Sequence, residues 1–192
     1  MKHTRAIELL KSTGALLEGH FLLTSGNHSD TYIQCAQLLS RPQTAVVFME
    51  DIAEHFRGEA IDTVVAPAVG GILVSYEVAR LLGKRAIFLE REQGVMSLRR
   101  GFYIERGERV LIVEDVITTG GSVLEVRDAV QGAGGIVQGF GSIVNRSSGR
   151  FVPKEPYYYC IEMEVPIYPP GKCPLCARNI PVVKPGSREL AP

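Results

Sequence analysis

The fold is decided by one stretch, Val110-Leu-Ile-Val-Glu-Asp-Val-Ile-Thr-Thr-Gly-Gly-Ser122. Its four consecutive apolar residues, Val110 to Val113, predict a strand buried on both faces, as in a parallel sheet. Glu114 and Asp115 end this strand, and a turn of threonine and glycine leads into a predicted helix. Ligands of open α/β sheets bind at the carboxyl ends of the strands, where loops meet helix N-termini. Carboxylates accept hydrogen bonds from sugar hydroxyls, and such a turn cradles a phosphate, so the stretch predicts a site for a phosphorylated sugar.

A simpler interpretation of this stretch is a buried strand that runs into an ordinary helix cap. Glu114 and Asp115 would then be solvated charges at the strand end. The acidic pair, the threonines and the glycines all stand in register with the strand, which favours the binding site. A Walker A phosphate loop is excluded, because no Gly-Lys-Ser/Thr tripeptide occurs in the sequence.

Alternating strands and helices surround this stretch and predict a parallel α/β sheet with helices on both faces. The predicted strands span residues 63–66, 86–90, 109–114 and 136–144, and the predicted helices between them span 72–82 and 122–131. Upstream, we expect a helix over 2–14, two short β-like runs at 20–23 and 31–35, and a helix to Gly58 with Ser40 as its cap. The segment 91–106 is charged and aperiodic, so it predicts a long loop between two strands expected to be neighbours.

Composition limits the class of protein. The chain has 192 residues, 45% of them hydrophobic and 22% charged, which suits one domain with a sizeable core. The formal net charge is +0, so neither nucleic acid nor an anionic membrane is expected as a partner. No apolar run approaches the roughly 20 residues of a membrane span, and the N-terminus lacks a signal-peptide pattern. We therefore expect a cytoplasmic protein.

The stretch around Glu114 and Asp115 resembles the phosphoribosyl-pyrophosphate (PRPP) signature of type I phosphoribosyltransferases. The resemblance implies that the acidic pair holds the ribose hydroxyls and that the following loop wraps the 5-phosphate. It also implies a sheet core over about 41–149 with a small hood, formed by about 14–40 and the tail 150–192, all in one domain. The PRPP-binding residues it implies are Val69, Gly70, Gly71, Glu114, Asp115, Val116, Ile117, Thr118, Thr119, Gly120, Gly121 and Ser122.

The segment Ala66-Pro-Ala-Val-Gly-Gly71 resembles the pyrophosphate loop of the same family. Adjacent glycines at a strand end let the backbone approach a ligand and direct N–H groups at an anion. Many relatives carry a lysine where Gly70 stands, so backbone groups or another residue must replace it here. Alone, the segment would also fit a glycine-rich helix start that serves packing.

The segment Arg91-Glu-Gln-Gly-Val-Met-Ser-Leu-Arg-Arg-Gly101 resembles the mobile catalytic loop, which in this family closes over the active site of the neighbouring subunit. The resemblance therefore implies a homodimer. Arg91 aligns with the family pattern, whereas Arg99 and Arg100 are proposed as catalytic from their chemistry, since guanidinium matches phosphate geometry. Better-known relatives use lysines and a histidine here. A charged loop can also be plain solvated surface.

The choice of base rests on the segments Phe21 to Gly26 and Ser29 to Tyr32, which resemble the hood of the orotate phosphoribosyltransferases within this family. The resemblance implies that Ser25 and Gly26 offer backbone groups to the pyrimidine edge. It implies that the Arg146 guanidinium binds the orotate carboxylate, which purines lack. Thr118 can touch both substrates. Thr24 stands where a lysine is common.

The resemblance thus implies an Mg²⁺-dependent orotate phosphoribosyltransferase, with orotate and PRPP as substrates and with Mg²⁺ held mainly by PRPP rather than by protein ligands. A purine phosphoribosyltransferase is the first alternative, because it would share the whole PRPP signature. A PRPP-sensing regulator without catalysis is the second, although such a protein usually adds a basic nucleic-acid-binding element.

Cys173-Pro-Leu-Cys176 has the spacing of half a zinc site, but a structural zinc ion needs four ligands. All four histidines lie in the first third of the sequence, so none is near this pair along the chain. We therefore predict a C-terminal turn held by Pro174. A redox pair, or a zinc ion shared across a dimer, remains the alternative.

Overall fold

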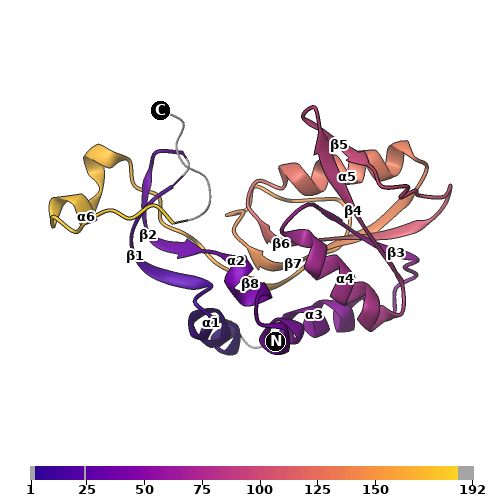
Figure 1. The fold of residues 1–192 in the computed structure, drawn as a ribbon, viewed down its shortest axis with the longest axis horizontal. Helices are drawn as coiled ribbons and strands as arrows, with labels where there is room; N and C mark the ends of the chain where they lie inside the picture. The colour runs from indigo at the N-terminus through magenta and orange to yellow at the C-terminus, as the bar shows by residue number, and fades with distance from the viewer. Residues whose placement is uncertain (1–2, 24, 186–192) are drawn as a thin grey trace.

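Two sheets of different size organise the chain, in a computed structural model that describes residues 3–23 and 25–185 (Figure 1). The larger sheet has six strands in the order β5-β4-β3-β6-β7-β8. Their bounds are β3 Thr63–Pro67, β4 Arg85–Glu92, β5 Val95–Leu98, β6 Arg109–Ile117, β7 Ile136–Asn145 and β8 Tyr157–Glu162. All neighbouring pairs are parallel except β4 and β5, which form an antiparallel hairpin. The predicted parallel α/β sheet is confirmed.

Helices cover both faces of this sheet, because its central strands are apolar on both sides. Every residue of β3 is buried, as are Val110 to Val113 of β6. Helices α3 (Pro42–Phe56) and α4 (Gly71–Leu82) pack on one face, and α5 (Gly121–Gly132) packs on the other. Each helix presents an apolar stripe to the strands. This arrangement brings the carboxyl ends of β3 and β6 together, where the sequence predicts the site.

The smaller sheet is an antiparallel hairpin of β1 (Leu16–Leu22) and β2 (His28–Ile33), preceded by α1 (His3–Ser12) and followed by the short α2 (Cys35–Leu39). The C-terminal part of the chain returns to pair with this hairpin. His28 and Tyr168 exchange backbone hydrogen bonds of 2.8 Å, and the amide of Leu22 donates to the carbonyl of Val183 at 2.9 Å. Strand β8 lies in the expected hood tail 150–192 but belongs to the larger sheet, so from here the name hood is used for β1 and β2 with the segment 168–185. It includes η1 (Pro170–Lys172) and α6 (Pro174–Ala177).

Several expectations about individual elements are wrong. Segment 91–106 is not an aperiodic loop throughout, since β4 runs on to Glu92 and pairs with β5. The strands on either side of it are not neighbours, because β3 lies between β4 and β6. Ser40 does not cap α3; it ends α2 and donates to the carbonyl of Gln37, while Arg41 precedes α3. Strand β8 was not predicted at all.

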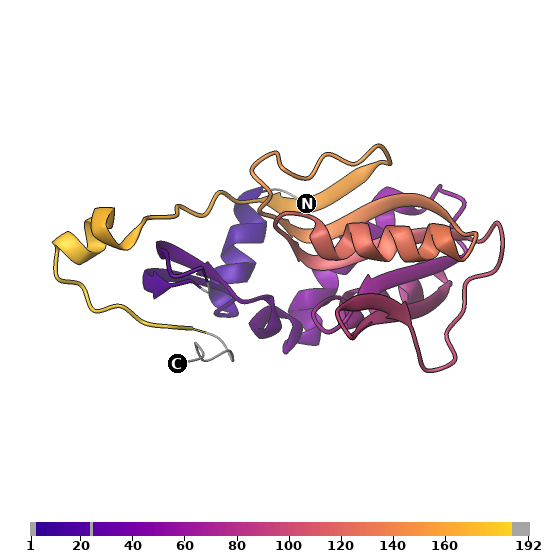
Figure 2. The ribbon, with the colours of Figure 1, turned by 90° about the horizontal axis from the view of Figure 1, so that it is seen from above.

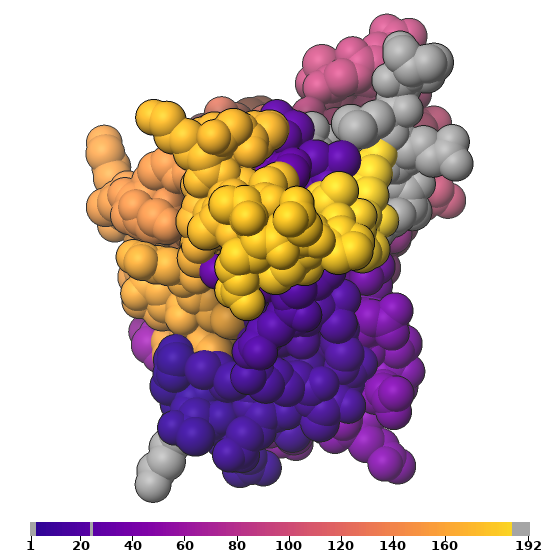
Figure 3. All heavy atoms as spheres, turned by 90° about the vertical axis from the view of Figure 1, so that its left-hand side faces the viewer, coloured from indigo at the N-terminus to yellow at the C-terminus, as the bar shows by residue number. Residues whose placement is uncertain are grey.

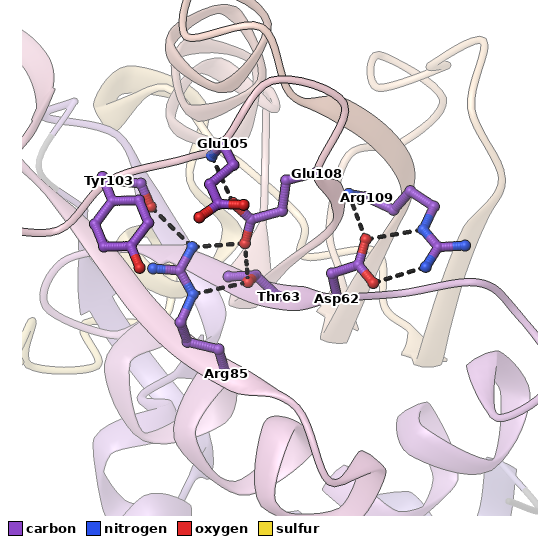
Figure 4. A network of polar contacts seen from close by, with 7 residues as sticks. All are labelled: Asp62, Thr63, Arg85, Tyr103, Glu105, Glu108 and Arg109. Carbon is purple, nitrogen blue, oxygen red and sulfur yellow. Dashed lines mark hydrogen bonds and ion pairs between the residues drawn. The ribbon is translucent and has the colours of Figure 1, made fainter.

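The amino ends of β3, β4 and β6 carry a network of paired charges (Figure 4). The Arg85 guanidinium donates to Glu108 at 2.5 Å and to the carbonyl of Tyr103 at 2.8 Å, and Thr63 also donates to Glu108. Arg109 and Asp62 form a bidentate pair beside it, at 2.7 and 2.8 Å. A hollow of about 370 Å³ opens here. Its charged groups bind each other, and it lies at the opposite strand ends from the predicted site.

Among the described residues, none of the helices has the length and apolar character needed to cross a membrane.

Candidate functional site

The acidic pair Glu114 and Asp115 lies in the C-terminal half of β6, which extends to Ile117 and so runs beyond the predicted strand end. Both residues are partly buried. The amide of Val116 donates to an Asp115 carboxylate oxygen at 2.8 Å, and the amide of Asp115 donates to Glu114 at 3.1 Å. These short-range hydrogen bonds fix the two carboxylates beside their own backbone.

The glycine loop after β3 lies directly against this pair. A Cβ atom added to Gly70 would come within 2.8 Å of one Asp115 carboxylate oxygen and 2.9 Å of the other. At Gly71 it would lie 3.1 Å from a Glu114 carboxylate oxygen and 2.7 Å from the Ala66 side chain. The structure therefore brings the predicted pyrophosphate loop and the acidic pair together. In this conformation a side chain at Gly70 would have to displace the Asp115 carboxylate. Val69 is largely exposed beside the two glycines.

The turn after β6 forms a small hollow of about 60 Å³ at the start of α5. Within the described residues, the backbone N–H groups of Thr118, Thr119 and Gly120 have no hydrogen-bond partner. Gly120 has φ +79°, and a Cβ there would overlap the Phe151 ring at 2.1 Å. Free N–H groups at the start of a helix bind anions. The hollow is lined by predicted PRPP-binding residues, namely Glu114, Val116, Ile117, Thr118, Thr119, Gly120, Gly121 and Ser122, together with Val123.

Electrostatics prepare the acidic pair for a cationic or hydroxyl-bearing ligand. Burial raises the pKa of Glu114, and the adjacent Asp115 charge raises it further. Burial also raises the pKa of Asp115, against hydrogen bonds that lower it. Two desolvated carboxylates side by side disfavour double ionisation. A ligand that supplies positive charge or hydroxyl donors relieves this repulsion.

The three loop arginines do not reach the acidic pair; each forms an ion pair with a glutamate. Arg91 lies 2.6 Å from Glu125 of α5, and Arg100 lies 2.7 Å from Glu90 of β4. Arg99 lies 3.4 Å from Glu92. The hairpin that carries these residues projects from the edge of the sheet, at β5 in Figure 1. Exposed ion pairs of this kind contribute only about 0–1 kcal/mol to stability, so a phosphate can replace the glutamates as partners of these arginines.

Arg146 follows β7, and its amide donates to the carbonyl of Ile117 at 2.8 Å. This hydrogen bond places Arg146 beside the turn that follows β6. Its guanidinium is partly buried, and burial lowers its pKa. In the part of the chain that the structure describes, no carboxylate pairs with it. A partly desolvated cation without a counter-ion is a ready site for an anion.

Ser25 and Gly26 lie in the turn that joins β1 to β2, and Thr24 lies outside the described residues. Gly26 has φ +79°, and its amide donates to the carbonyl of Leu23 at 2.9 Å. No hydrogen bond within the described residues connects this turn to Arg146 or to the acidic pair. The turn therefore belongs to the hood, and its part in a shared site stays a prediction.

Sequence reasoning missed one group of side chains. His20 and His28 lie beside Cys173 and Cys176, and one ligand atom of each is within 4.8 Å of all the others. The expectation that no histidine is near the two cysteines is thus wrong in space, although it is right along the chain. The β1–β2 hairpin brings His20 to His28, whereas the predicted β-like runs at 20–23 and 31–35 leave His28 in the loop between them. We call this group the His–Cys cluster.

Comparison with known proteins identifies a family model and full-length relatives that this chain resembles. Residues 35–170 match the phosphoribosyl transferase domain. The chain is 50% identical to the orotate phosphoribosyltransferase of Caldanaerobacter subterraneus subsp. tengcongensis over 190 residues, which cover 99% of this chain and 100% of that protein. It is 52% identical to the orotate phosphoribosyltransferase of Pelotomaculum thermopropionicum over the same shares of the two chains.

Solved structures agree with the fold. The orotate phosphoribosyltransferase of Aeropyrum pernix superposes with a TM-score of 0.65 at 27% identity, covering 74% of this chain and 82% of that one. The adenine phosphoribosyltransferase of Rhodothermus marinus superposes with a TM-score of 0.67 at 21% identity, covering 83% and 99%. The shared architecture is therefore common to enzymes that act on different bases.

Proposed function

The chain belongs to the phosphoribosyltransferase family, and from this premise we propose that it transfers the 5-phosphoribosyl group of PRPP to orotate, giving orotidine 5-phosphate and pyrophosphate. One observation carries the choice of base. Identity of about half to orotate phosphoribosyltransferases extends over 99% of the chain, and so includes the hood as well as the sheet core. The likeness to an adenine enzyme is one of fold, at 21% identity.

The PRPP site is assigned to the carboxyl ends of β3 and β6. Glu114 and Asp115 accept hydrogen bonds from the ribose hydroxyls, and the N–H groups of the turn from Thr118 to Ser122 bind the 5-phosphate. The N–H groups at Val69 to Gly71 bind the pyrophosphate. The proximity of Gly70 to Asp115 supports this assignment, because ribose and pyrophosphate are joined at the anomeric carbon.

Magnesium fits this donor set. Mg²⁺ prefers carboxylate, phosphate and water oxygens, and in such sites one or two carboxylates supplement the substrate phosphates. Glu114 and Asp115 would supply those carboxylates, although PRPP would hold most of the coordination. Bound there, the ion would neutralise charge on the pyrophosphate leaving group.

Arg146 is assigned to the orotate carboxylate. Its guanidinium has the geometry for a bidentate contact, and it lies next to the turn that binds the 5-phosphate. Thr118 in that turn would touch both substrates, while Ser25 and Gly26 would offer backbone groups to the pyrimidine edge. These roles place orotate between the hood and the sheet core.

The reaction needs little acid–base chemistry, because orotate is already an anion when it attacks the anomeric carbon. The acidic pair favours positive charge on the sugar ring as the pyrophosphate leaves. Orientation of two bound reactants can supply about 7–11 kcal/mol of the barrier reduction. The arginines of the β4–β5 hairpin would bind the departing pyrophosphate and exclude water, which would otherwise capture the sugar.

The proposal is tested by following orotate absorbance after mixing the protein with PRPP and Mg²⁺, in parallel with adenine, hypoxanthine and xanthine. We expect orotate alone to be consumed, and only with the metal ion present. Sites built to bind a substrate group reject analogues without it by about 10⁴–10⁵-fold, so the preference should be plain. Turnover of a purine would refute the assignment of the base. PRPP binding without turnover of any base would favour the regulator instead.

We also propose a homodimer in which Arg91, Arg99 or Arg100 serves the partner's site. Mixing the inactive variants Asp115→Asn and Arg99→Ala tests this directly. If Arg99 acts across the interface, subunit exchange should restore about one quarter of wild-type activity, through mixed dimers with one intact site. No recovery, with mixed dimers present by mass spectrometry, would assign Arg99 to its own subunit.

A further inference from the structure

The His–Cys cluster gathers four ligand atoms around one point. They are Nε2 of His20 on β1, Nδ1 of His28 on β2, and Sγ of Cys173 and Cys176 in and next to α6. We propose that this cluster binds one Zn²⁺ ion, which joins the N-terminal hairpin of the hood to the C-terminal segment. Two thiolates and two imidazoles are a common ligand set for structural zinc.

The distances suit a tetrahedral ion. With Zn–S near 2.3 Å and Zn–N near 2.0–2.1 Å, a tetrahedron has sulfur–nitrogen edges of about 3.6 Å. In the structure, the His20 nitrogen lies 3.5 Å from the Cys173 sulfur and 3.7 Å from the Cys176 sulfur, and the His28 nitrogen lies 3.3 Å from the Cys176 sulfur. The two imidazole nitrogens are 2.7 Å apart, closer than the roughly 3.3 Å of such an edge. Metal binding therefore requires the two imidazole nitrogens to move apart by about 0.6 Å.

A backbone contact already sets the tautomer of one ligand. Nδ1 of His20 lies 2.7 Å from the carbonyl oxygen of Ile180. A carbonyl only accepts, so Nδ1 carries the proton and Nε2 presents its lone pair to the two sulfurs. Metal-binding histidines typically donate their other N–H in this way, which orients the ring and raises its basicity. Ile180 belongs to the segment that the ion would hold.

The hood contributes few residues to the hydrophobic core, so it is a unit that a bound ion would stabilise. The two hydrophobic clusters of the described residues include Leu16 and Ile33 at the base of the hairpin, but nothing from its tip or from 168–185. Figure 2 shows the C-terminal segment extending away from the sheet, and Figure 3 shows it lying on the indigo hairpin. A small unit without its own core is usually stabilised by disulfides or a metal. His20, His28 and Cys173 are buried here, while Cys176 is exposed and leaves a path for the ion.

Two other states of the cluster make different predictions. In one, Cys173 and Cys176 form a disulfide, and the two imidazoles share a hydrogen bond. In the other, the thiols stay reduced and no metal binds. The presence of two buried imidazoles next to both sulfurs favours zinc, because neither a disulfide nor a free thiol pair needs them. Only zinc binding uses all four side chains as ligands.

Metal content of the full-length protein, purified without added metal or chelator, is the first test. We expect about one zinc per chain by mass spectrometry. Replacement by Co²⁺ should give the visible bands of a tetrahedral ion and a thiolate charge-transfer band. Zinc-free protein that also takes up no Co²⁺ under reducing conditions would overturn the proposal, as would an intact Cys173–Cys176 disulfide in protein isolated from reducing cytosol.

Ligand variants give the second test. Cys176→Ser and His28→Asn should weaken Zn²⁺ binding by at least about 10–100-fold, the loss seen when even an outer-shell partner is removed. His55→Asn is the matched control, since His55 is exposed on α3 and far from the cluster in sequence and fold. Unchanged zinc affinity in either ligand variant would overturn the ligand assignment.

A readout independent of metal analysis uses trypsin. Lys172 and Arg178 are exposed and flank the two cysteines, so zinc should protect the peptide bonds that follow them. We expect a strong chelator to accelerate cleavage there in the wild-type protein, and added Zn²⁺ to restore protection. The same chelator should leave the Cys176→Ser variant unaffected, because its cleavage is already fast. Equal cleavage of wild-type protein with and without chelator would contradict the proposed role of the ion.

Discussion

Replacing Gly70 by alanine tests the closeness of the glycine loop to the acidic pair. The new Cβ would lie 2.8 Å from an Asp115 carboxylate oxygen, so the carboxylate must move by about 0.6 Å to reach ordinary contact at 3.4 Å. Gly70 has φ −58° and ψ −41°, which alanine adopts freely, so the backbone does not resist the change. A misplacement of about 1 Å costs about 10²-fold in rate, so we expect a fall of about tenfold in kcat/KM for PRPP.

The assay is loss of orotate absorbance at varied PRPP, with thermal unfolding measured in parallel. Gly132→Ala is the matched control, because it ends α5 and a Cβ there meets nothing within 4 Å. The double variant Gly70→Ala/Asp115→Asn should lose little more activity than Asp115→Asn alone, since the alanine acts through that carboxylate. Activity of Gly70→Ala within twofold of wild type, or fully additive losses, would refute the reasoning.

Three further predictions concern the same site. Asp115→Asn should lower turnover by about 10²–10³-fold, the loss typical of one transition-state electrostatic contact, and near-normal turnover would remove Asp115 from the ribose. Arg146→Ala should raise the KM for orotate far more than that for PRPP, and equal effects would place it elsewhere. Glu114→Gln should stabilise the protein as pH rises. The folded-state pKa of Glu114 is raised, so the folded protein retains a proton that the unfolded chain releases. The free energy of unfolding of the wild type therefore falls as the pH rises above the ordinary carboxyl pKa. The variant lacks this loss, so its Tm advantage should be absent below about pH 4 and grow toward neutrality, by about 2–4 °C for each kcal/mol relieved.

The sheet core follows from the sequence because its signals are local. Runs such as Val110 to Val113 are apolar over consecutive positions, and glycines mark the helix starts at Gly71 and Gly121. The phosphate turn and the glycine loop were predicted for the same reason, since their positions depend only on adjacent residues. Strand β8 was missed because it lies at the sheet edge, where its three tyrosines are only partly buried and Glu162 is exposed.

The His–Cys cluster could not be predicted with equal ease, because its members are 145 residues or more apart between the two pairs. The long-range backbone pairings of His28 with Tyr168 and of Phe21 with Val183 bring them together. The ion pairs of the loop arginines were missed for a related reason. Arg91 of β4 pairs with Glu125 of α5, and a local sequence pattern does not show that these two elements lie together. Analysing the sequence one segment at a time therefore identifies both residues of such a pair but does not show that they are in contact.

The pairing of β2 with the segment around Tyr168 also governs the order in which the molecule can assemble. All six strands of the larger sheet are available once residue 162 has been synthesised, whereas the hood waits for about twenty residues more. Closing a loop of 140 residues is entropically costly, so this docking should come last and be the first to open. If the hood contacts the base as proposed, that contact depends on the final event of folding, whereas the proposed PRPP site on the sheet core forms before it.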